Sequence, residues 1–596
     1  MNVFLSTISF KSRVYIPYAT GCLISYCLKD EFFKQNFNFI KPEYRPDPLQ
    51  FENFHERLKK SDIIGLTCFV WNQSVNDRIA KTYKSYRPDG IVLYGGPNVP
   101  GQEEDAKEYA NNRPYVDLFF YGPGERNFKN FLKDYYFTKN LENHEGSYTA
   151  NNFNITISKE DYVVTETPDP YSDGIFDEIL KEEQELAVVI ETNRGCPYRC
   201  TFCDWGSLTA SKVYKFNMDI IKSNIDYVMK FDSVKHINIT DANFGMFARD
   251  VEIIDYLYES KIRHNKEVLE LLFGGMAKNG STYVKEIYKK IEKFTVDVHS
   301  DSQKHNTKNM RVSFQTLSKE ALEVVNRKNI KTEKLLDSLA STTNKTLSSE
   351  LIIGLPGETP ESWLSTLEQN INLNLEFIAV YHLVVLPNTP MYDKEYRKKY
   401  NIKFTRVYIP EDLNNLNMSD FSNHTKNLFN YKTEYNFNKD TLNFNTYEIM
   451  NSCYSYTTEE LKLMYLYYFW VNTFWNSRLL SSYIQKSNMS IKEQVKMFFK
   501  FIDEGKMPFF KSLIENYKFG LDKIFNNSSV VVLDDLYTVI FLQKSMGRGT
   551  ELIDIVENLD KVKSELSLIY PNFDADHITQ IPNKPRLLSA YVTLVK

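Results

Sequence analysis

The chain has 596 residues, of which 42% are hydrophobic and 25% are charged, values typical of a globular protein. This length exceeds what one hydrophobic core supports, so we expect about three domains. The net charge of -5 and the lack of a long Lys/Arg run argue against a nucleic-acid-binding surface.

The cysteines indicate metal or redox chemistry. Seven cysteines are too few for a disulfide framework. Three of them fall within eight residues, and this clustering is typical of a metal or redox site in a reducing compartment. Residues 1–15 do not have the pattern of a signal peptide. The most apolar stretch, residues 461–480, contains Lys462 and Arg478 and is predicted to be a buried helix rather than a membrane span. We expect a cytoplasmic protein.

Residues 1–140 alternate between strand and helix patterns. The expected strands are Asn2–Thr7, Phe37–Ile40, Asp62–Phe69, Gly90–Tyr94 and Asp117–Tyr121. The expected helices are Tyr18–Phe33, a stretch ending at Lys60, Asn72–Tyr86, Glu103–Asn111 and one after Glu125. Because these strands are apolar throughout, they predict a parallel sheet covered on both faces, in an α/β domain of the Rossmann-like (flavodoxin-like) type.

Three loops follow the carboxyl ends of these strands, where open α/β sheets bind ligands. They are Thr67–Gln73, Gly95–Gly101 and Gly122–Arg126. Their glycines allow the backbone to approach a ligand closely. The alternative is that they are only turns.

The rest of the chain divides into three parts. Residues 141–185 are polar and contain prolines, which indicates a linker. Residues 186–395 contain six expected strands, separated by helices such as Asp250–Ser260 and Thr282–Lys293, and so predict a partial (β/α)6 barrel. The six strands are Leu186–Glu191, Val234–Thr240, Leu269–Phe273, Met310–Gln315, Leu347–Ile353 and Phe377–Val385. Residues 396–596 are aromatic and helix-patterned, and predict a mainly helical domain that caps the barrel and shapes the substrate pocket.

The segment after the first barrel strand is the most specific motif. It holds Cys196, Cys200 and Cys203 in a C-x3-C-x2-C spacing, with bends at Gly195 and Pro197. Three thiolates can bind three irons of a [4Fe–4S] cluster and leave the fourth iron open to another ligand. Structural zinc is the rival reading, but zinc requires four ligands and the nearest further candidate, His236, is on a different predicted strand.

This motif, with Phe202 before the last cysteine and a β/α barrel around it, resembles the radical S-adenosylmethionine (SAM) superfamily. The resemblance covers residues 186–395. It implies that SAM chelates the open iron, that the cluster donates an electron, and that a 5′-deoxyadenosyl radical then abstracts hydrogen from a substrate. It also implies that Phe202 belongs to the SAM site.

Other SAM-binding residues follow from the same resemblance. Asp241 and Asn243, after the second barrel strand, occupy the place where such enzymes hold the SAM amine, although the commoner Gly-Gly-Glu is absent. The alternative is a cap for the helix that follows. Gln315, at the end of the fourth strand, is a candidate for the SAM ribose or carboxylate, with strand-end capping as its alternative.

The fifth and sixth strands complete this predicted pocket. Ile353 and Gly354 lie in a run that ends Gly-Leu-Pro-Gly-Glu-Thr, which family members commonly show beside the adenine. Leu386, after the sixth strand, is predicted to add backbone to the same pocket. His382, alone on an apolar strand, is interpreted as a core residue rather than a catalyst.

A five-unit Rossmann-like domain before the barrel resembles the cobalamin-dependent class of radical SAM enzymes. The segments Cys203–Gly206 and Asp241–Gly245 resemble its methyltransferase branch (class B), which includes carbapenem C-methyltransferases. The implied cobalamin-binding residues are Thr67, Trp71, Asn72, Gly95, Gly96, Pro97, Gly122, Gly124 and Glu125.

One departure concerns cobalt. Domains that ligate cobalt through histidine use Asp-x-His-x-x-Gly, whereas the only histidine in residues 1–140 is His55, which lacks both flanking residues. If cobalamin binds, cobalt has no protein histidine ligand. Trp71 is the candidate to cover the lower face of cobalt, with packing against the linker as its alternative.

The resemblance implies two uses of SAM. One molecule methylates cob(I)alamin and leaves S-adenosylhomocysteine, and a second yields the radical that activates an unactivated carbon to collect the methyl group. The implied partners are a small-molecule or peptide substrate and a flavodoxin-type reductant, without nucleic acid or a membrane.

Three alternatives remain at this point. The first is a cobalamin-binding radical SAM enzyme that catalyses a rearrangement or cyclisation without methylation. The second is a methylthiotransferase, although Cys22, Cys27 and Cys68 do not form the extra cluster set of that class and are interpreted, like Cys453, as buried hydrophobes. The third is a non-enzymatic iron–sulfur or cobalamin-binding regulator.

Overall fold

The structure, a computed structural model, divides into two compact units. It describes residues 1–9, 14–153, 155, 167–182, 185–207, 211–266, 269–274, 282–291, 294, 309–329, 346–410, 444–526, 529–531, 555 and 558–574. The first unit holds the described residues up to 294 together with 386–393. The second unit holds 309–329, 346–385 and the described residues from 394 to 574.

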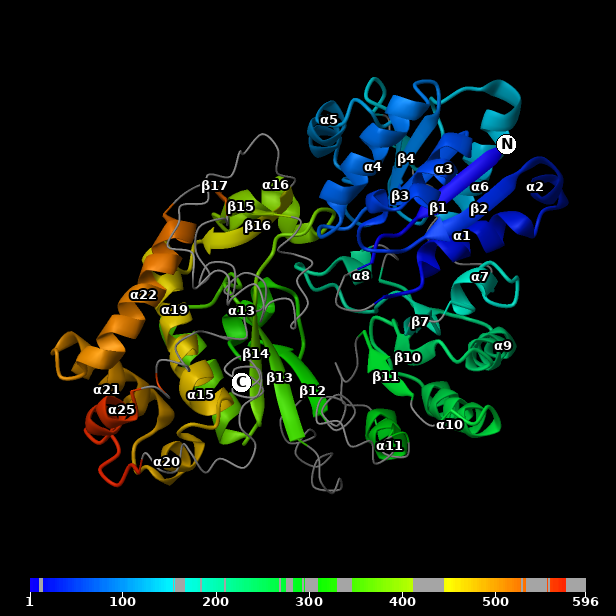
Figure 1. The fold of residues 1–596 in the computed structure, drawn as a ribbon. Helices are drawn as coiled ribbons and strands as arrows, with labels where there is room; N and C mark the ends of the chain where they lie inside the picture. The colour runs from blue at the N-terminus through cyan, green and yellow to red at the C-terminus, as the bar shows by residue number, and fades with distance from the viewer. Residues whose placement is uncertain are drawn as a thin grey trace. The chain divides into compact units, whose positions relative to one another are not determined.

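The first unit begins with a six-stranded sheet of order β2-β1-β3-β4-β5-β6 (Figure 1). Strands β1 to β5 pair in parallel, and β6 pairs antiparallel with β5. The bounds are β1 Asn2–Ser6, β2 Asn38–Glu43, β3 Ile63–Thr67, β4 Ile91–Gly95, β5 Leu118–Phe120 and β6 Ser147–Tyr148. The five predicted strands are therefore confirmed. The sixth strand was missed because its two residues carry no apolar periodicity.

Helices cover both faces of this sheet, as the apolar strands predicted. One face packs against α1 Tyr18–Leu28, α2 Glu31–Asn36 and α6 Glu125–Thr138. The other packs against α3 Glu52–Lys60, α4 Gln73–Tyr86 and α5 Glu103–Asn111. A short 3-10 helix, η1 (Pro48–Gln50), precedes α3. The single helix predicted over 18–33 is two helices, because Asp30 caps α2 by accepting a hydrogen bond from the Phe32 amide.

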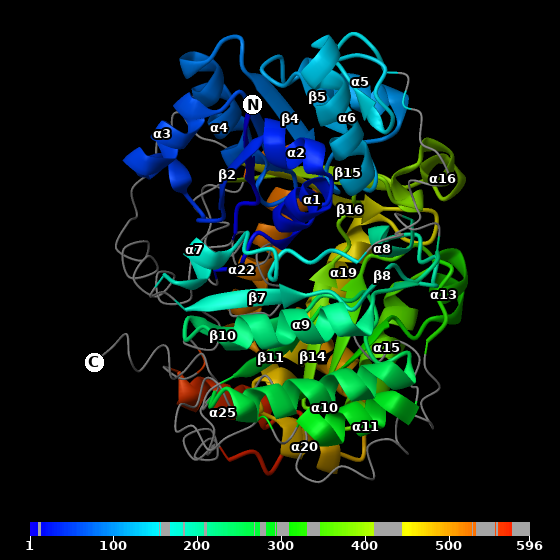
Figure 2. The ribbon, with the colours of Figure 1, turned by 90° about the vertical axis from the view of Figure 1, so that its right-hand side faces the viewer.

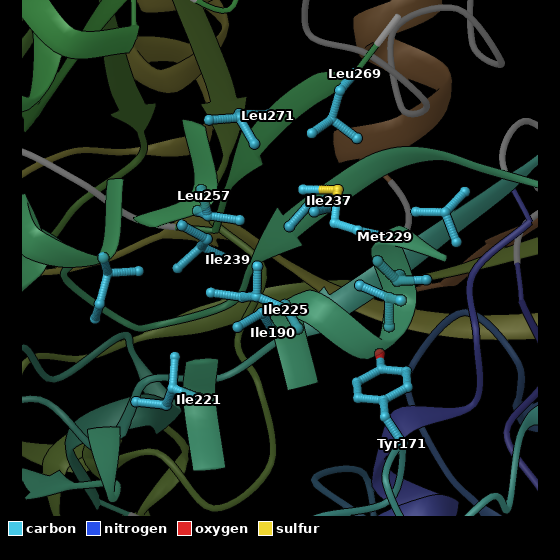
Figure 3. Packing of buried hydrophobic residues seen from close by; sticks show 14 of the residues in the cluster. Tyr171, Ile190, Ile221, Ile225, Met229, Ile237, Ile239, Leu257, Leu269 and Leu271 are labelled. Atoms are coloured by element: carbon cyan, nitrogen blue, oxygen red, sulfur yellow. The ribbon is translucent and has the colours of Figure 1, made fainter. Parts of the chain in front are cut away.

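The same unit contains a three-stranded parallel sheet of order β11-β10-β7. Its strands are β7 Leu186–Ile190, β10 Val234–Ile239 and β11 Glu270–Phe273. The helices α9 Met218–Met229 and α10 Ala248–Arg263 lie beside it (Figure 2), and α11 is Thr282–Ile291. Ile190, Ile225, Ile237 and Leu257 interdigitate in its core (Figure 3). The short helix α7 (Asp177–Leu180) precedes β7. After β7, the short strands β8 (Asn193–Arg194) and β9 (Tyr214–Lys215) form an antiparallel pair.

The second unit contains a parallel sheet of order β12-β13-β14. Its strands are β12 Asn309–Gln315, β13 Thr346–Ile353 and β14 Phe377–His382, with helices α13 Lys319–Val324 and α15 Pro360–Asn372. All six strands predicted for residues 186–395 are thus present, three in each unit.

The remainder of the second unit is largely helical. Its helices are α16 Lys394–Lys399, α19 Thr458–Trp470, the π-helix η5 Val471–Asn476, α20 Ser481–Lys486, α21 Ile491–Asp503, α22 Pro508–Phe525 and α25 Leu559–Leu566. The prediction for residues 396–596 omitted a mixed sheet of β15 Lys403–Pro410, β16 Phe444–Ser452 and β17 Ser529–Val531. In β15, Thr405 and Val407 are buried between less buried neighbours, an alternation that identifies a strand.

The apolar stretch 461–480 is packed inside the second unit, where Met464, Trp470 and Trp475 are buried. Within the described ranges, no helix combines the length and the apolar composition needed to cross a bilayer.

Candidate functional site

The three motif cysteines lie in a loop, residues 191–203, which we call the cluster loop. It leaves β7, passes through β8 and ends where α8 (Asp204–Ser207) begins. Gly195 turns the chain at φ +98°, a conformation that favours glycine. Cys196 and Cys200 are buried, Cys203 is partly exposed, and the Cys203 amide donates to the Cys200 carbonyl at 3.1 Å. Three thiols in one tight loop are the donor set that an iron–sulfur cluster needs.

None of the seven cysteines, all of which lie in the described part of the chain, forms a disulfide bond. Across the described residues, no three His, Cys, Asp or Glu side chains are arranged to hold a metal ion. The case for a cluster therefore rests on the donor type and the spacing of the cysteines. His236, the rival zinc ligand, instead contacts Glu270, with its Nδ1 2.6 Å from the Glu270 Oε2.

Asp241 anchors the start of the cluster loop. Its Oδ1 accepts from the Thr192 amide at 2.7 Å and from the Asn193 amide at 3.2 Å, and its Oδ2 accepts from the Asn193 side chain at 2.6 Å and from the Thr192 hydroxyl. Burial raises the pKa of Asp241 to about 7, against the opposing effect of these donors. Both carboxylate oxygens are thus engaged within the loop. Asp241 was predicted to hold the SAM amine, and in the structure its carboxylate binds Thr192 and Asn193 of the cluster loop. The sequence analysis did not predict this contact.

The neighbouring positions after β10 are equally buried. Asn243 is fully buried. The capping role considered for this segment belongs to Asp250, whose Oδ2 accepts from the amides of Gly245 at 2.8 Å and Phe247 at 3.1 Å. Phe202 is partly buried within the cluster loop.

In the second unit, the predicted SAM residues lie at strand ends. Gln315 ends β12 with φ +65°, a conformation uncommon for a residue with a side chain. Such backbone strain is typical of functional sites. Ile353 is buried and its carbonyl accepts from the Leu383 amide at 3.2 Å, and the Gly354 carbonyl accepts from the Tyr456 hydroxyl at 2.5 Å.

Glu358, which sequence reasoning did not single out, joins the same strand ends. It is fully buried and accepts hydrogen bonds from the hydroxyls of Thr316 and Ser362. Burial raises its pKa to about 7. His382 is partly buried, and its Nδ1 lies 2.6 Å from the Tyr465 hydroxyl.

The loops at the carboxyl edge of the first sheet are internally braced. We call 67–73, 95–101 and 122–126, which the sequence predicts to bind cobalamin, the cobalamin-side loops. In the first of them, the Asn72 side chain donates to the Thr67 carbonyl at 3.0 Å and accepts from the Phe69 amide at 2.8 Å. Trp71 stacks on Phe69 with ring centroids 4.4 Å apart and planes inclined by 10°. The Trp71 ring is therefore held in place by the loop itself.

The glycines of the second loop differ in what they require. A Cβ on Gly96, which has φ +103°, would lie 2.8 Å from the Cys68 carbonyl oxygen, so only glycine fits there. A Cβ on Gly95 would meet only the Phe120 Cβ at 3.7 Å, an ordinary contact. The fold therefore requires glycine at position 96 but leaves room for a Cβ at position 95. Pro97 is partly buried and its carbonyl accepts from the Asn388 side chain at 3.1 Å.

The third loop ends in a buried charge cluster. Gly122 has φ +83°, and a Cβ on Gly124 would lie 3.2 Å from the Leu23 side chain. Glu125 accepts from the Arg194 Nη1 at 2.7 Å, and Arg194 also donates to Glu191 at 2.8 and 2.9 Å. Arg194 lowers the pKa of Glu125 against the effect of burial. A residue predicted to bind cobalamin therefore contacts the cluster loop.

Segment 386–393 approaches both sets of loops within the first unit. It begins at Leu386, includes the 3-10 helix η4 (Pro390–Tyr392), and holds Asn388 against loop 95–101. The Met391 amide donates to the Thr201 carbonyl of the cluster loop at 2.9 Å.

His55, the only histidine in residues 1–140, lies on α3 and not in these loops. Its Nε2 lies 2.7 Å from the Leu49 carbonyl and its Nδ1 lies 3.1 Å from the Tyr86 hydroxyl.

The chain is similar to several known proteins. Residues 190–369 match the model of the radical SAM superfamily. The chain is 29% identical over 413 residues to the cobalamin-dependent radical SAM methyltransferase TokK of Streptomyces tokunonensis, covering 66% of this chain and 57% of TokK. It is also 29% identical over 415 residues to the 2-(S-pantetheinyl)-carbapenam-3-carboxylate methyltransferase of Streptantibioticus cattleyicolor, covering 67% of this chain and 58% of that protein. The matches thus span less than two thirds of either relative.

The fold has a counterpart among solved structures. The cobalamin-dependent SAM radical enzyme OxsB, solved with aqua-cobalamin and SAM bound, superposes with a TM-score of 0.50 and 14% identity. The match covers 99% of this chain and 83% of OxsB, and at this identity it concerns the fold alone. The chain therefore contains a radical SAM domain over residues 190–369 and is similar in sequence to cobalamin-dependent radical SAM methyltransferases.

Proposed function

We propose that this chain is a cobalamin-dependent radical SAM methyltransferase that methylates an unactivated carbon. The observation that carries the proposal is the pairing, within one compact unit, of a three-thiol loop and a Rossmann-like sheet whose carboxyl edge ends in glycine loops. The likeness to TokK and to the carbapenam methyltransferase supports the same reading.

The domain assignment forms part of this proposal. We assign residues 1–140 to cobalamin, 141–185 to a linker, 186–395 to the radical SAM barrel and 396–596 to substrate binding and capping. Cys196, Cys200 and Cys203 would hold the cluster. Phe202, Asp241, Asn243, Gln315, Ile353, Gly354 and Leu386 would line the SAM site.

The chain's own residues prepare these sites. When bound, the cluster supplies the electron that cleaves SAM to a hydrogen-abstracting radical, and cobalamin supplies a carrier for the methyl group. Asp241 fixes the backbone that leads to Cys196, because it gathers the amides of Thr192 and Asn193 on one carboxylate. Burial of Cys196 and Cys200 limits the access of water and oxygen to the thiolates.

The first domain would bind cobalamin without a histidine ligand to cobalt. His55 is committed to the Leu49 carbonyl and the Tyr86 hydroxyl on a helix rather than at the carboxyl edge. Trp71, held against Phe69, is the candidate for the lower face of cobalt. If cobalamin binds here without a protein ligand to cobalt, the lack of that ligand would favour the reduced, strongly nucleophilic form that accepts a methyl group.

The proposal extends to partners. A small molecule or peptide would be the substrate, and a flavodoxin-type protein would supply electrons. An oxygen-sensitive cluster held by thiols is suited to a reducing compartment, so we place the protein in the cytoplasm.

The test uses SAM labelled with a trideuteromethyl group. The protein, with its cluster reconstituted and cobalamin bound, is incubated anaerobically with labelled SAM and a low-potential reductant, and bound cobalamin is analysed by mass spectrometry. The expected product is trideuteromethyl-cobalamin together with S-adenosylhomocysteine, and neither requires the unidentified substrate.

Two other outcomes would overturn the proposal. Labelled SAM that yields 5′-deoxyadenosine but no labelled cobalamin would indicate a non-methylating radical enzyme. Intact SAM in protein that holds both reduced cobalamin and a full cluster would favour the non-enzymatic reading.

A further inference from the structure

Arg194 joins the cluster loop to a cobalamin-side loop. Its guanidinium uses Nε and Nη2 on Glu191, at 2.9 and 2.8 Å, and Nη1 on Glu125, at 2.7 Å. The three side chains are 22, 15 and 17% exposed in the order Arg194, Glu191 and Glu125. Arg194 precedes Cys196 by two residues, and Glu125 directly follows Gly124. One planar cation therefore spans the two loops.

This contact is specific in geometry. A guanidinium offers donors in a rigid fork, so it fixes the relative orientation of the carboxylates that it binds. Because the group is largely buried, removing Arg194 would leave the two carboxylates of Glu191 and Glu125 without a counter-charge. This contact therefore fixes the position of Glu125 relative to the residues that precede Cys196.

Asn388 makes a second, independent connection. Its side-chain amide donates to the carbonyls of Pro97 at 3.1 Å and Val99 at 2.8 Å, and its oxygen accepts from the Gly101 amide at 2.9 Å. The residue has φ +66°, a conformation that asparagine tolerates better than most residues. One side chain therefore satisfies three backbone groups of loop 95–101.

The segment that carries Asn388 also holds the far end of the cluster loop. Three residues later, the Met391 amide donates to the carbonyl of Thr201, which lies between Cys200 and Cys203. The cluster loop is therefore tied to the cobalamin-side loops at two points, through Arg194 before the three cysteines and through segment 386–393 at Thr201, between Cys200 and Cys203.

We infer that Arg194 and Asn388 are positioning residues that hold the cluster loop against the cobalamin-side loops, so that cluster loading and cobalamin binding strengthen each other. The inference rests on the proposed function. It goes beyond it because neither residue needs to touch a cofactor. Linkage requires the effect to be reciprocal: if the loaded cluster tightens cobalamin binding, bound cobalamin stabilises the cluster by the same factor.

The test measures the hydroxocobalamin dissociation constant by absorbance, anaerobically, on full-length protein before and after cluster reconstitution. Iron and sulfide analysis verifies loading. For the wild type we expect the loaded cluster to tighten cobalamin binding by a factor on the order of 5 to 100, the usual range of coupling between sites. The quantity compared among variants is this ratio, not the affinity itself, because Glu125 is also a cobalamin candidate.

Two variants separate the connections. Glu125→Gln keeps an acceptor but removes the charge that pairs with Arg194. Asn388→Gly keeps the positive φ and removes all three side-chain hydrogen bonds. We expect each variant to lower the ratio toward one, and the variant that breaks the main connection to bring it within about twofold of one. The matched control is Asp117→Asn, which weakens the Lys84–Asp117 pair, with side chains 21 and 23% exposed, at the amino edge of the same sheet. It should leave the ratio unchanged.

The outcomes distinguish this inference from the proposed function. A wild type that binds both cofactors with a ratio of one overturns the inference and leaves the function standing. The same holds if both variants fold, load their clusters and keep the wild-type ratio. A wild type that binds neither cofactor overturns the function itself.

Discussion

The Thr316 hydroxyl donates a hydrogen bond to the buried carboxyl group of Glu358. Thr316 follows the strained Gln315 at the end of β12, and Glu358 lies in the loop after β13, so this contact joins two neighbouring strand ends of the predicted SAM pocket. The Ser362 hydroxyl donates to the other carboxyl oxygen. The ionisable side chain of Glu358 therefore connects the loops that follow β12 and β13.

Glu358 should make the stability of the protein depend on pH. Burial raises its pKa to about 7, so the native state retains a proton that the unfolded state has already lost. Between about pH 4.5 and 7 the native state binds more protons, and the free energy of unfolding therefore falls as pH rises through this window.

Glu358→Gln should remove that dependence. The amide can replace both hydrogen bonds, since the Ser362 hydroxyl also lies 3.1 Å from the Thr359 carbonyl and can donate there instead. At pH 8 we expect the variant to gain up to about 3 kcal/mol over the wild type, at about 1.4 kcal/mol per pKa unit, and little at pH 4.5. Thermal unfolding of both proteins from pH 4.5 to 8 checks this. Parallel stability curves would contradict it.

Gly95 and Gly96 should respond differently to alanine. At Gly95 the fold has room for a Cβ, so Gly95→Ala should keep its melting temperature and lose cobalamin affinity if the cofactor approaches this backbone. At Gly96 the positive φ and the Cys68 carbonyl exclude a Cβ, so Gly96→Ala should lose more than about 1 kcal/mol of stability. Calorimetry and cobalamin titration measure the two effects. Unchanged cobalamin binding in Gly95→Ala would mean that the cofactor stays away from this glycine.

Trp71 should control the environment of bound cobalamin. Trp71→Phe keeps an aromatic ring beside Phe69, whereas Trp71→Ala removes the ring that stacks on Phe69. Because an aromatic contact is worth about 0.5–1.5 kcal/mol, the alanine variant should bind cobalamin roughly 2- to 10-fold more weakly. Its cob(II)alamin should show an altered electron paramagnetic resonance spectrum, and the phenylalanine variant should resemble the wild type. Identical spectra in all three proteins would place Trp71 away from cobalt.

Two buried cysteines offer a matched pair for cluster assembly. Cys200→Ala removes a predicted ligand, and Cys453→Ala removes a buried thiol 3.2 Å from the Ser455 hydroxyl in the second unit. We expect reconstituted Cys200→Ala to lack the [4Fe–4S] absorbance and iron content that Cys453→Ala retains. Equal iron content in the two variants would argue against the assigned ligands.

Much of the fold could be predicted from local patterns. Five strands of the first sheet and the six strands of residues 186–395 were predicted because short segments rich in apolar residues alternate with helical patterns along the chain. The sheet β15–β16–β17 was missed because its strands are separated by long intervals, so their pairing depends on non-local contacts. The two-residue strand β6 is too short to carry a periodic signal.

The site was predicted less completely than the fold. The cysteines and the glycine loops were recognisable, because fixed spacing and residue type are visible in the sequence. Arg194, Asn388 and Glu358 were not singled out, because each makes a hydrogen bond to a residue 42 to 291 positions away, and local patterns do not show such contacts. The structure also finds Asp241 and Glu125, both predicted to bind cofactors, engaged in contacts with the cluster loop.

The central claim, radical cleavage of SAM combined with methyl transfer through cobalamin, is tested most directly by the products of SAM. The reconstituted protein and a Cys203→Ala variant are incubated anaerobically with SAM, reductant and hydroxocobalamin, and the products are quantified by mass spectrometry. The account predicts 5′-deoxyadenosine that disappears in Cys203→Ala and S-adenosylhomocysteine that disappears when cobalamin is omitted. Unconsumed SAM in wild-type protein with a full cluster and bound cobalamin would contradict it.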